Sequence, residues 1–175
     1  MAIKQLIQRY SLQPHPEGGF YKEEYRSTET ISVARGERPA MTAIYFLLQG
    51  QHFSAWHQIQ SDEVWAYLEG NADCCIHMID ELGDYSKQYL GTHHDTARQL
   101  FTVPARVWFA VDVLPSDQNS DNSDDDYALC SCIVAPGFHW QDFALPSRET
   151  LSKMYPQHDT LIQQFTRDSV DAKPT

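Results

Sequence analysis

Short segments with a two-residue hydrophobic period fill the middle of the sequence and constrain its fold more than any other feature. In the clearest of them, Glu63, Trp65 and Tyr67 alternate with apolar neighbours, so the three side chains would share one face of a strand. Similar alternation or short apolar runs occur at residues 41–48, 53–59, 72–79, 107–113 and 127–135. Strands at this spacing, separated by turn residues and not by helical patterns, predict an all-β sandwich or barrel.

The two ends of the chain carry a helical pattern instead. Apolar residues spaced i, i+3, i+4 and i+7 over residues 3–10 predict a short N-terminal helix, which Pro14 and Pro16 would end. Near the other end, Ser147 is the expected N-cap of helical turns over residues 148–165. The predicted fold is therefore a β barrel with short helices at both ends.

The length of 175 residues predicts a single domain over residues 1–175. A strongly polar stretch at about residues 115–127 is expected to be a loop inserted between two strands. Within it, Asp117-x-Asn119-x-Asp121 begins like a calcium-binding EF-hand loop. The glycine and the glutamate that such a loop needs at its sixth and twelfth positions are missing, so a solvated loop is favoured.

Charge and cysteine content restrict the class of partner. Thirteen Lys and Arg against 24 Asp and Glu give a net charge of −11, which would repel nucleic acid and anionic membrane surfaces. No apolar run is long enough to span a membrane, and the start lacks the apolar core of a signal peptide. The cysteines, at 74, 75, 130 and 132, do not form a disulfide or zinc-knuckle pattern. We therefore expect a cytoplasmic protein whose partner is a small molecule.

His57 and Glu63 are the first candidates for chemistry. They lie on two predicted strands joined by a polar turn, which would bring the imidazole and the carboxylate close together. Such a pair can ligate a metal ion, act as general acid and base, or form a structural hydrogen bond. Spacing alone leaves these three interpretations open.

The segment around this pair resembles the first cupin motif, in which a His-x-His pair is followed by Glu and, after six further residues, by Gly. His57 matches the first His, Glu63 the Glu and Gly70 the Gly, whereas Ile59 replaces the second His. Residues 102–109 resemble the second cupin motif. Pro104 matches it, but Arg106 occupies the usual Gly position and Phe109 the position of the metal-binding His. The resemblance thus implies that two of the four usual metal ligands are missing.

The chain is further similar to one small branch of this superfamily, the "cupin 5" group of unknown function. Five motifs carry the resemblance, in order, from about residue 5 to 165: His15-Pro-Glu-Gly-Gly-Phe20, Tyr25-Arg-Ser27, Thr42-Ala-Ile-Tyr-Phe-Leu47, Ser61-Asp-Glu-Val-Trp65 and Val134-Ala-Pro-Gly-Phe138. The resemblance implies a double-stranded β-helix, the jelly-roll cupin barrel, which is usually dimeric and holds a ligand pocket. It is likened in shape to deoxysugar epimerases of the rhamnose pathway and to seed storage proteins, but it implies no secure reaction.

Three functions are compatible with these residues. The working hypothesis is metal-independent acid/base isomerisation or epimerisation of a carbohydrate-like molecule, with no cofactor. The first alternative is a small-molecule binding protein without catalysis, and the second is a metal-dependent cupin enzyme, for which His77 and His139 are the available extra ligands. Because Ile59 and Phe109 stand where two of the usual cupin ligands would be and cannot ligate a metal ion, the sequence predicts that the protein binds no stoichiometric transition metal.

The hypothesis assigns roles to particular side chains. The candidate catalytic residues are His57 as base, Glu63 as its partner, and Tyr67 or Tyr45 as proton donor. The candidate ligand-binding residues are Glu17, Trp65, Trp108, Arg26 and His139. Trp65 and Trp108 are expected to line the barrel as flat walls, and Glu17, between a proline and two glycines, is expected to close one end of it.

Overall fold

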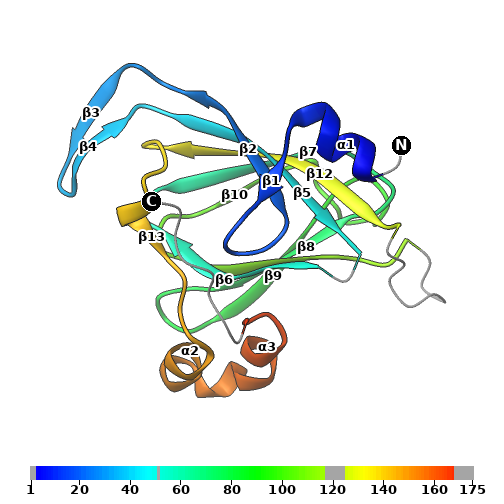
Figure 1. The fold of residues 1–175 in the computed structure, drawn as a ribbon. Helices are drawn as coiled ribbons and strands as arrows, with labels where there is room; N and C mark the ends of the chain where they lie inside the picture. The colour runs from blue at the N-terminus through cyan, green and yellow to red at the C-terminus, as the bar shows by residue number, and fades with distance from the viewer. Residues whose placement is uncertain (1–2, 51, 117–124, 168–175) are drawn as a thin grey trace.

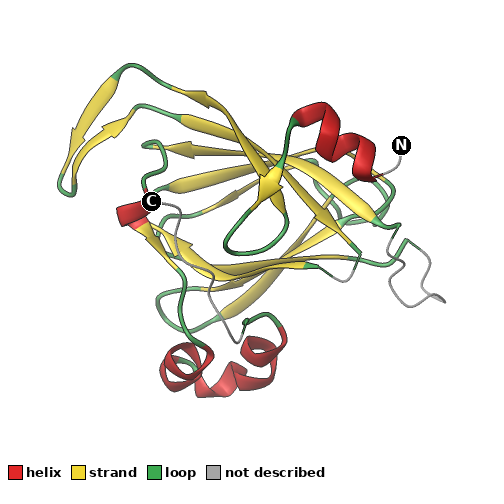
Figure 2. Ribbon diagram, in the orientation of Figure 1, coloured by secondary structure: helices red, strands yellow, loops and turns green. Residues whose placement is uncertain are grey.

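Two antiparallel β-sheets face one another and enclose the core of the protein (Figures 1 and 2). The structure is a computed structural model that describes residues 3–50, 52–116 and 125–167. The inserted polar stretch therefore falls largely outside the described residues, and so does the calcium-like segment within it. Among the described residues, no helix is long and apolar enough to cross a membrane.

The first sheet has six strands in the order β1-β2-β5-β12-β7-β10. Their bounds are β1 Gln13–Pro14, β2 Phe20–Arg26, β5 Thr42–Gln49, β12 Tyr127–Ala135, β7 Asp62–Gly70 and β10 Leu100–Val103. The long strand β12 pairs with β5 on one side and with β7 on the other, so segments far apart in the sequence form the centre of this sheet.

The second sheet has five strands in the order β13-β6-β11-β8-β9. Their bounds are β13 Phe143–Ala144, β6 Phe53–Ile59, β11 Trp108–Val113, β8 Cys74–Ile79 and β9 Tyr85–Leu90. Strands β6 and β7 are consecutive in the chain but belong to different sheets. The short connection between them therefore crosses from one wall of the barrel to the other.

A third, two-stranded sheet projects from the barrel. It is the hairpin of β3, Thr30–Val33, and β4, Gly36–Pro39, which extends beyond the ends of the other strands in Figure 1. Both Arg35 and Arg38 of this hairpin bind the carboxylate of Asp142, with nitrogen–oxygen distances of 2.8 and 2.7 Å. These ion pairs hold the hairpin against the short 3-10 helix η1, Trp140–Asp142.

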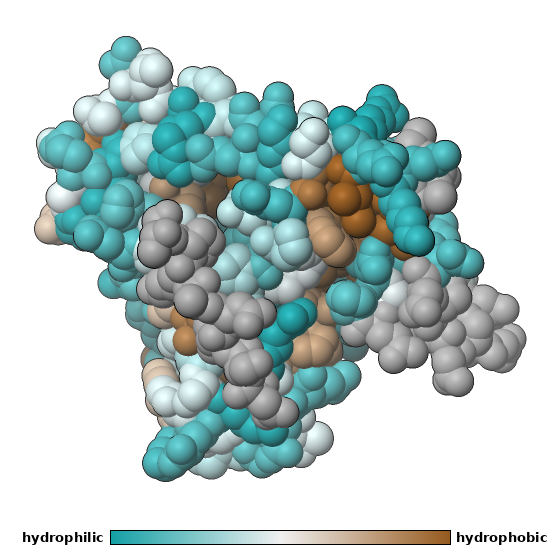
Figure 3. All heavy atoms as spheres, viewed as in Figure 1, coloured by the Kyte–Doolittle hydropathy of each residue, from teal (hydrophilic) through white to brown (hydrophobic). Residues whose placement is uncertain are grey.

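Helices cover the outer face of each sheet. Helix α1, Ile3–Tyr10, packs its apolar face on the first sheet through buried Leu6 and its neighbours. On the face shown in Figure 3, most of the surface is hydrophilic and hydrophobic atoms gather beside this helix. Helices α2, Arg148–Met154, and α3, Asp159–Gln164, joined by the 3-10 turn η2, Pro156–His158, cover the second sheet.

The all-β jelly roll with terminal helices predicted from the sequence is confirmed. The predicted N-terminal helix over residues 3–10 is found, and the Ser147 hydroxyl caps α2 by accepting a hydrogen bond from the Thr150 amide. Each predicted strand is present within one to two residues of its expected bounds. The sequence did not predict β2, β9 or β10, whose side chains are largely exposed.

Candidate functional site

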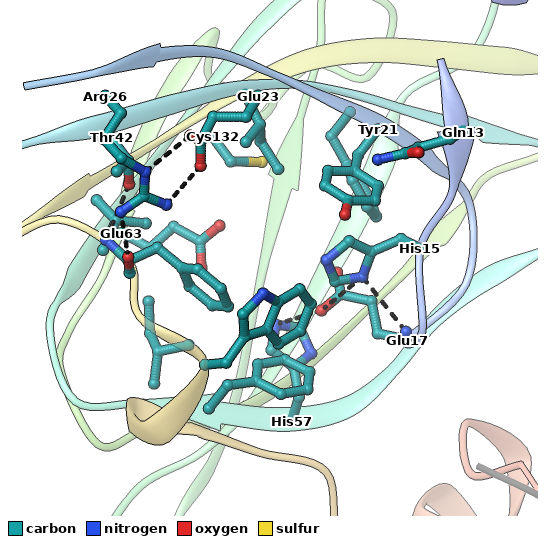
Figure 4. Close-up of a pocket in the computed structure, with 17 residues that line it drawn as sticks. Gln13, His15, Glu17, Tyr21, Glu23, Arg26, Thr42, His57, Glu63 and Cys132 are labelled. Atoms are coloured by element: carbon teal, nitrogen blue, oxygen red, sulfur yellow. Dashed lines mark hydrogen bonds and ion pairs between the residues drawn. The ribbon is translucent and has the colours of Figure 1, made fainter. Parts of the chain in front are cut away.

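A cavity of about 140 Å³ opens between the two sheets at the end of the barrel that carries η1 (Figure 4). Its polar side chains include His15, Glu17, His57 and Glu63, which come from the segment before β2 and from strands β6 and β7. Because β6 and β7 lie in different sheets, His57 and Glu63 occupy different walls of the cavity. The cavity thus concentrates two imidazoles and two carboxyl groups in one buried place.

The segment that carries Glu17 folds inward before β2 begins. Gly18 and Gly19 have positive φ angles of 115° and 71°, a conformation that glycine adopts without steric cost. A Cβ atom on Gly18 would lie 2.2 Å from the Phe53 carbonyl oxygen, so only glycine permits this close approach to β6. The Pro-Glu-Gly-Gly sequence therefore positions Glu17, whose exposed fraction is 5%, inside the barrel.

Glu17 is the hydrogen-bonding centre of the cluster. Its Oε1 accepts a hydrogen bond from the Ser54 hydroxyl at 2.9 Å. Its Oε2 lies 3.3 Å from His57 Nε2 and 3.6 Å from His15 Nδ1. The expected pairing of His57 with Glu63 is therefore wrong: the partner of His57 is Glu17, and Glu63 is on the opposite wall.

Backbone groups determine which imidazole nitrogens carry hydrogen. His57 Nδ1 lies 2.7 Å from the Ala55 carbonyl oxygen, which only accepts, so Nδ1 carries a hydrogen, and in the neutral ring Nε2 has the lone pair. His15 Nδ1 accepts a hydrogen bond from the Glu17 amide at 3.3 Å, so it too has a lone pair. The lone pair of His15 Nδ1 is thus used by the Glu17 amide. His57 Nε2, 3.3 Å from Glu17 Oε2, is the nitrogen that can accept a hydrogen bond from a protonated Glu17 carboxyl group.

Burial favours the same neutral forms. Desolvation lowers the pKa of His57 to about 4, and together with repulsion from His57 it lowers the pKa of His15 to about 3. Burial, reinforced by the negative charge of Glu63, raises the pKa of Glu17 well above its ordinary value, although the Ser54 hydrogen bond opposes this rise. Burial therefore favours the uncharged form of all three groups of the cluster.

Glu63 is the group of the cavity that titrates near neutrality. It is 7% exposed, and burial raises its pKa to about 7, against a smaller opposing effect of the hydrogen bond with Cys132. A carboxyl group with such a pKa is populated both as acid and as base at physiological pH. The cavity therefore contains two carboxyl groups, Glu17 and Glu63, whose pKa values are both raised by burial.

The remaining walls are aromatic and carry little net charge. Phe138, Trp140 and Phe143 line one side, and the Trp140 ring stacks on His15 with centroids 5.9 Å apart. Arg26 lines the mouth, but its guanidinium binds both carboxylate oxygens of Glu23 at 2.8 and 2.6 Å. The cation that lines the cavity is therefore already neutralised by an acidic neighbour.

The structure brings four of the proposed site residues to the cavity: Glu17, Arg26, His57 and Glu63. Trp65 and Tyr67 point inward on the same face as Glu63, as expected, but they fill the core beyond the cavity without lining it. The Tyr67 hydroxyl donates a hydrogen bond to the Ala72 carbonyl oxygen at 3.2 Å, so it is not positioned as a proton donor to a ligand.

Three other expectations of position are wrong. Tyr45 lies on the outer face of β5, where its ring packs against Tyr10 of α1 with centroids 4.6 Å apart. Trp108 lies on the outer face of β11 among the C-terminal helices, and its neighbour Phe109 points inward instead. His139 caps η1 through its ring nitrogen and does not line the cavity, because the turn of η1 presents Trp140 there.

Sequence reasoning missed two lining residues with clear roles, His15 and Tyr21. His15 belongs to the motif that carries Glu17, so its place beside that carboxyl group had a signal in the sequence. Tyr21 follows on β2, its ring makes an edge contact with His15 at 4.5 Å, and its hydroxyl is turned toward the cavity (Figure 4). Tyr21 therefore lines the cavity, whereas Tyr45 and Tyr67 do not.

The cavity does not offer the metal ligands of a complete cupin site. The side chains at the four corresponding positions are close together: His57, Ile59 and Glu63 line the cavity, and the Phe109 ring lies 4.0 Å from the His57 ring. Two of these four are hydrocarbon side chains that cannot ligate a metal ion. Among the described residues, the group whose ligand atoms converge closely enough for an ion lies elsewhere, at Cys75, His77 and Asp112.

One protein-family model and several solved structures are similar to this chain. The family model described as "Cupin superfamily (DUF985)" matches residues 4–146. A hypothetical protein from Leishmania major is 32% identical, with a TM-score of 0.87 over 96% of this chain and 100% of its own. A protein from Shewanella oneidensis is also 32% identical, with a TM-score of 0.84 over 97% and 99% of the two chains.

More distant structures share the fold alone. Oxalate decarboxylase from Bacillus subtilis is 12% identical, with a TM-score of 0.52 over 91% of this chain and 40% of that enzyme. No protein with a curated description matches the sequence. The comparisons therefore identify relatives and a fold without assigning a ligand or a reaction.

Proposed function

Because the chain belongs to the cupin superfamily, in the family described as DUF985, we propose that its barrel binds a small, uncharged, carbohydrate-like molecule and moves a proton on it. The observation that carries this proposal is the buried Glu17 carboxyl group, whose Oε2 faces ring nitrogens of both His57 and His15. Such a group keeps a proton in a buried place at neutral pH, where it can be donated to a bound molecule.

The size and charge of the cavity indicate the class of ligand. Its volume of about 140 Å³ is close to that of an engineered cavity of about 150 Å³ that binds benzene. The enclosed part of the ligand is therefore a short chain or a ring of about six heavy atoms. Arg26 is paired with Glu23, and Glu63 becomes negative near neutrality, so an anionic ligand is disfavoured. Aromatic walls beside polar groups suit the apolar and hydroxyl faces of a sugar.

Two carboxyl groups with different protonation provide the acid and the base. Glu63, as a carboxylate, would remove a proton from a carbon atom next to a carbonyl group. Glu17 would donate its proton toward the carbonyl oxygen, and the reverse transfers would return a proton to carbon. His57 and His15 would hold the Glu17 proton in position between turnovers. In this mechanism Glu63 replaces His57 as the base, and Glu17 replaces the tyrosine as the proton donor.

The experiment that tests this function follows proton exchange at carbon. Native mass spectrometry first identifies any small molecule that remains bound during purification. That molecule is then incubated with the protein in D2O. If no molecule is retained, the test substrates are glyceraldehyde, dihydroxyacetone and four- and five-carbon ketoses. We expect loss of the proton NMR signal next to the carbonyl group, much slower with His57→Ala than with the matched control His52→Ala.

Binding without turnover is the alternative outcome of this experiment. The aromatic wall alone would support it, because the three flat rings of Phe138, Trp140 and Phe143 can hold a ligand. Retention of a ligand by wild-type protein, with no exchange at any carbon of that ligand or of the test sugars, would replace catalysis by binding. One set of proton NMR spectra therefore distinguishes an isomerase from a binding protein.

We also propose that the protein forms a homodimer. Strand β10 is one edge of the six-stranded sheet, where Leu100 and, on the neighbouring β7, Leu68 are 61% and 47% exposed. An exposed apolar edge strand pairs readily with a second chain. Light scattering at micromolar concentration should give twice the chain mass of 20.1 kDa, and a particle of the single-chain mass would refute the dimer.

A further inference from the structure

Three potential metal ligands meet on the outer face of the second sheet, away from the cavity. Cys75 and His77 are two residues apart on β8, so their side chains share one face of the strand. Asp112 on β11 is directly opposite Cys75 in the register of the two strands, and Ala110 is opposite His77. One ligand atom from each of Cys75, His77 and Asp112 lies within 4.8 Å of the others. We propose that these three side chains bind a zinc ion, with water as the fourth ligand.

The sheet itself supplies the triangular arrangement. Two residues that are two positions apart on one strand point to the same side of a sheet. A residue directly opposite one of them on the next strand points to that side as well, and the three side chains lie at similar separations. Zinc bonds of about 2.0–2.3 Å require ligand atoms roughly 3.5 Å apart. His77 Nε2 and Asp112 Oδ1 are already 3.1 Å apart, so small side-chain rotations bring the third atom, the Cys75 sulfur, to a shared ion. Ala110 opposite His77 leaves space for the rotation.

The donor set matches the chemistry of zinc. Thiolate sulfur, imidazole nitrogen and carboxylate oxygen are its usual protein ligands. Cys75 as thiolate and Asp112 as carboxylate would together balance the charge of a divalent ion, which makes a neutral centre in a largely buried position. The Asp112 side chain is 25% exposed, compared with 11% for His77, so this side of the site is open to water and to an entering ion.

Surrounding groups hold the imidazole in the required orientation. His77 Nδ1 lies 2.8 Å from the Tyr85 hydroxyl of β9, a second contact of the kind that fixes metal-binding histidines. The Phe165 ring, which follows α3, packs on the His77 ring with centroids 4.7 Å apart. Lys87 of β9 is opposite His77 in register, but its ammonium group is directed to the Tyr89 ring, 5.1 Å from its centroid.

Nucleophilic chemistry is a poorer explanation of the same cluster. Burial raises the pKa of the Cys75 thiol to about 12, with a further contribution from Asp112. A thiol with such a pKa is not a reactive nucleophile at neutral pH. A metal ion would displace its proton on binding, as it does at other thiolate sites.

The test uses the full-length, reduced protein after removal of metal ions with a chelator. We expect calorimetric titration with Zn²⁺ to give one tight site per chain, and Co²⁺ to give the absorption of a thiolate-to-cobalt charge-transfer transition. Cys75→Ser and His77→Ala should abolish that absorption. His57→Ala, which changes the cavity but not the outer cluster, is the matched control and should retain it.

Tyr85→Phe should weaken metal binding without abolishing it, an effect that is not expected if His77 has a purely structural role. Loss of the contact to His77 should leave one Co²⁺ or Zn²⁺ per chain and weaken binding by about 10- to 100-fold. The proposal is overturned if wild-type protein binds no stoichiometric Zn²⁺. It is also overturned if His57→Ala removes the ion while His77→Ala keeps it, because the metal would then be in the cavity.

Discussion

Glu17→Gln is expected to slow proton exchange at the carbon of a bound ligand by about 10²- to 10⁴-fold, the usual contribution of a general acid or base. Glutamine has nearly the same shape as the protonated carboxyl group, so the hydrogen bond from Ser54 and the fold are preserved. It cannot release a proton to a ligand and be reprotonated. The loss should therefore appear in the rate of exchange and not in the stability of the protein.

Glu24→Gln is the matched control for this variant. Glu24 is an exposed glutamate of β2 that forms a surface ion pair with Lys22 at 3.7 Å. It should exchange the ligand proton as fast as wild type. Equal rates for Glu17→Gln, Glu24→Gln and wild type would show that Glu17 transfers no proton, and would leave the carboxyl group a purely structural role.

Glu63→Gln is expected to change the pH dependence of stability. A pKa of about 7 in the folded chain, against an ordinary value of 4.5, means that the folded state binds more protons than the unfolded state between these pH values. The free energy of unfolding therefore falls as pH rises from 4.5 to 7 and changes no further above that range. At about 1.4 kcal/mol per pKa unit, ionised Glu63 costs about 3 kcal/mol, which Glu63→Gln removes.

The histidines conceal this effect in the wild-type protein. His57, with a pKa lowered to about 4 from 6.5, destabilises the fold as pH falls through that interval, which is the opposite slope. The difference in free energy of unfolding between Glu63→Gln and wild type isolates the Glu63 contribution. Urea denaturation should show that this difference grows by about 3 kcal/mol in favour of the variant from about pH 4 to about pH 8. A difference that is constant with pH would mean that Glu63 ionises normally.

The fold was predictable because its central strands alternate or are uniformly apolar. Glu63, Trp65 and Tyr67 share the inner face of β7 as their spacing predicts. Strands β2 and β9 were not predicted because most of their side chains are exposed or only half-buried. Such strands lack the two-residue hydrophobic period that identifies a strand in a sequence.

The errors within the site come from strands that are buried on both faces. Trp108 and Phe109 are both buried, since β11 packs on the core on one side and on the C-terminal helices on the other. Asp112 is the one polar residue of β11, and it lies at the far end of the strand from this pair. Around Trp108 and Phe109 both faces are apolar, so the local pattern does not show which of the two neighbours points inward. Tyr45 has the same ambiguity, because α1 covers the outer face of β5.

The partner of His57 could not be read from local spacing. The sequence places Glu63 beside it along the chain, but the connection after β6 crosses to the other sheet. Glu17 reaches His57 through a turn that depends on two glycines with positive φ. Such a turn is visible in the sequence as an unusual motif, whereas the contact that it makes is a property of the folded chain.

The central claim is that Glu17 keeps a proton between unprotonated nitrogens of His15 and His57. Nitrogen-15 NMR of the histidine rings, assigned with His15→Gln and His57→Gln, measures this directly. The account predicts two neutral rings from about pH 8 down to about pH 5, with the hydrogen on Nδ1 of His57 and on Nε2 of His15. Imidazolium signals from either ring at neutral pH would contradict it, because the proton would then lie on nitrogen and Glu17 would be a carboxylate.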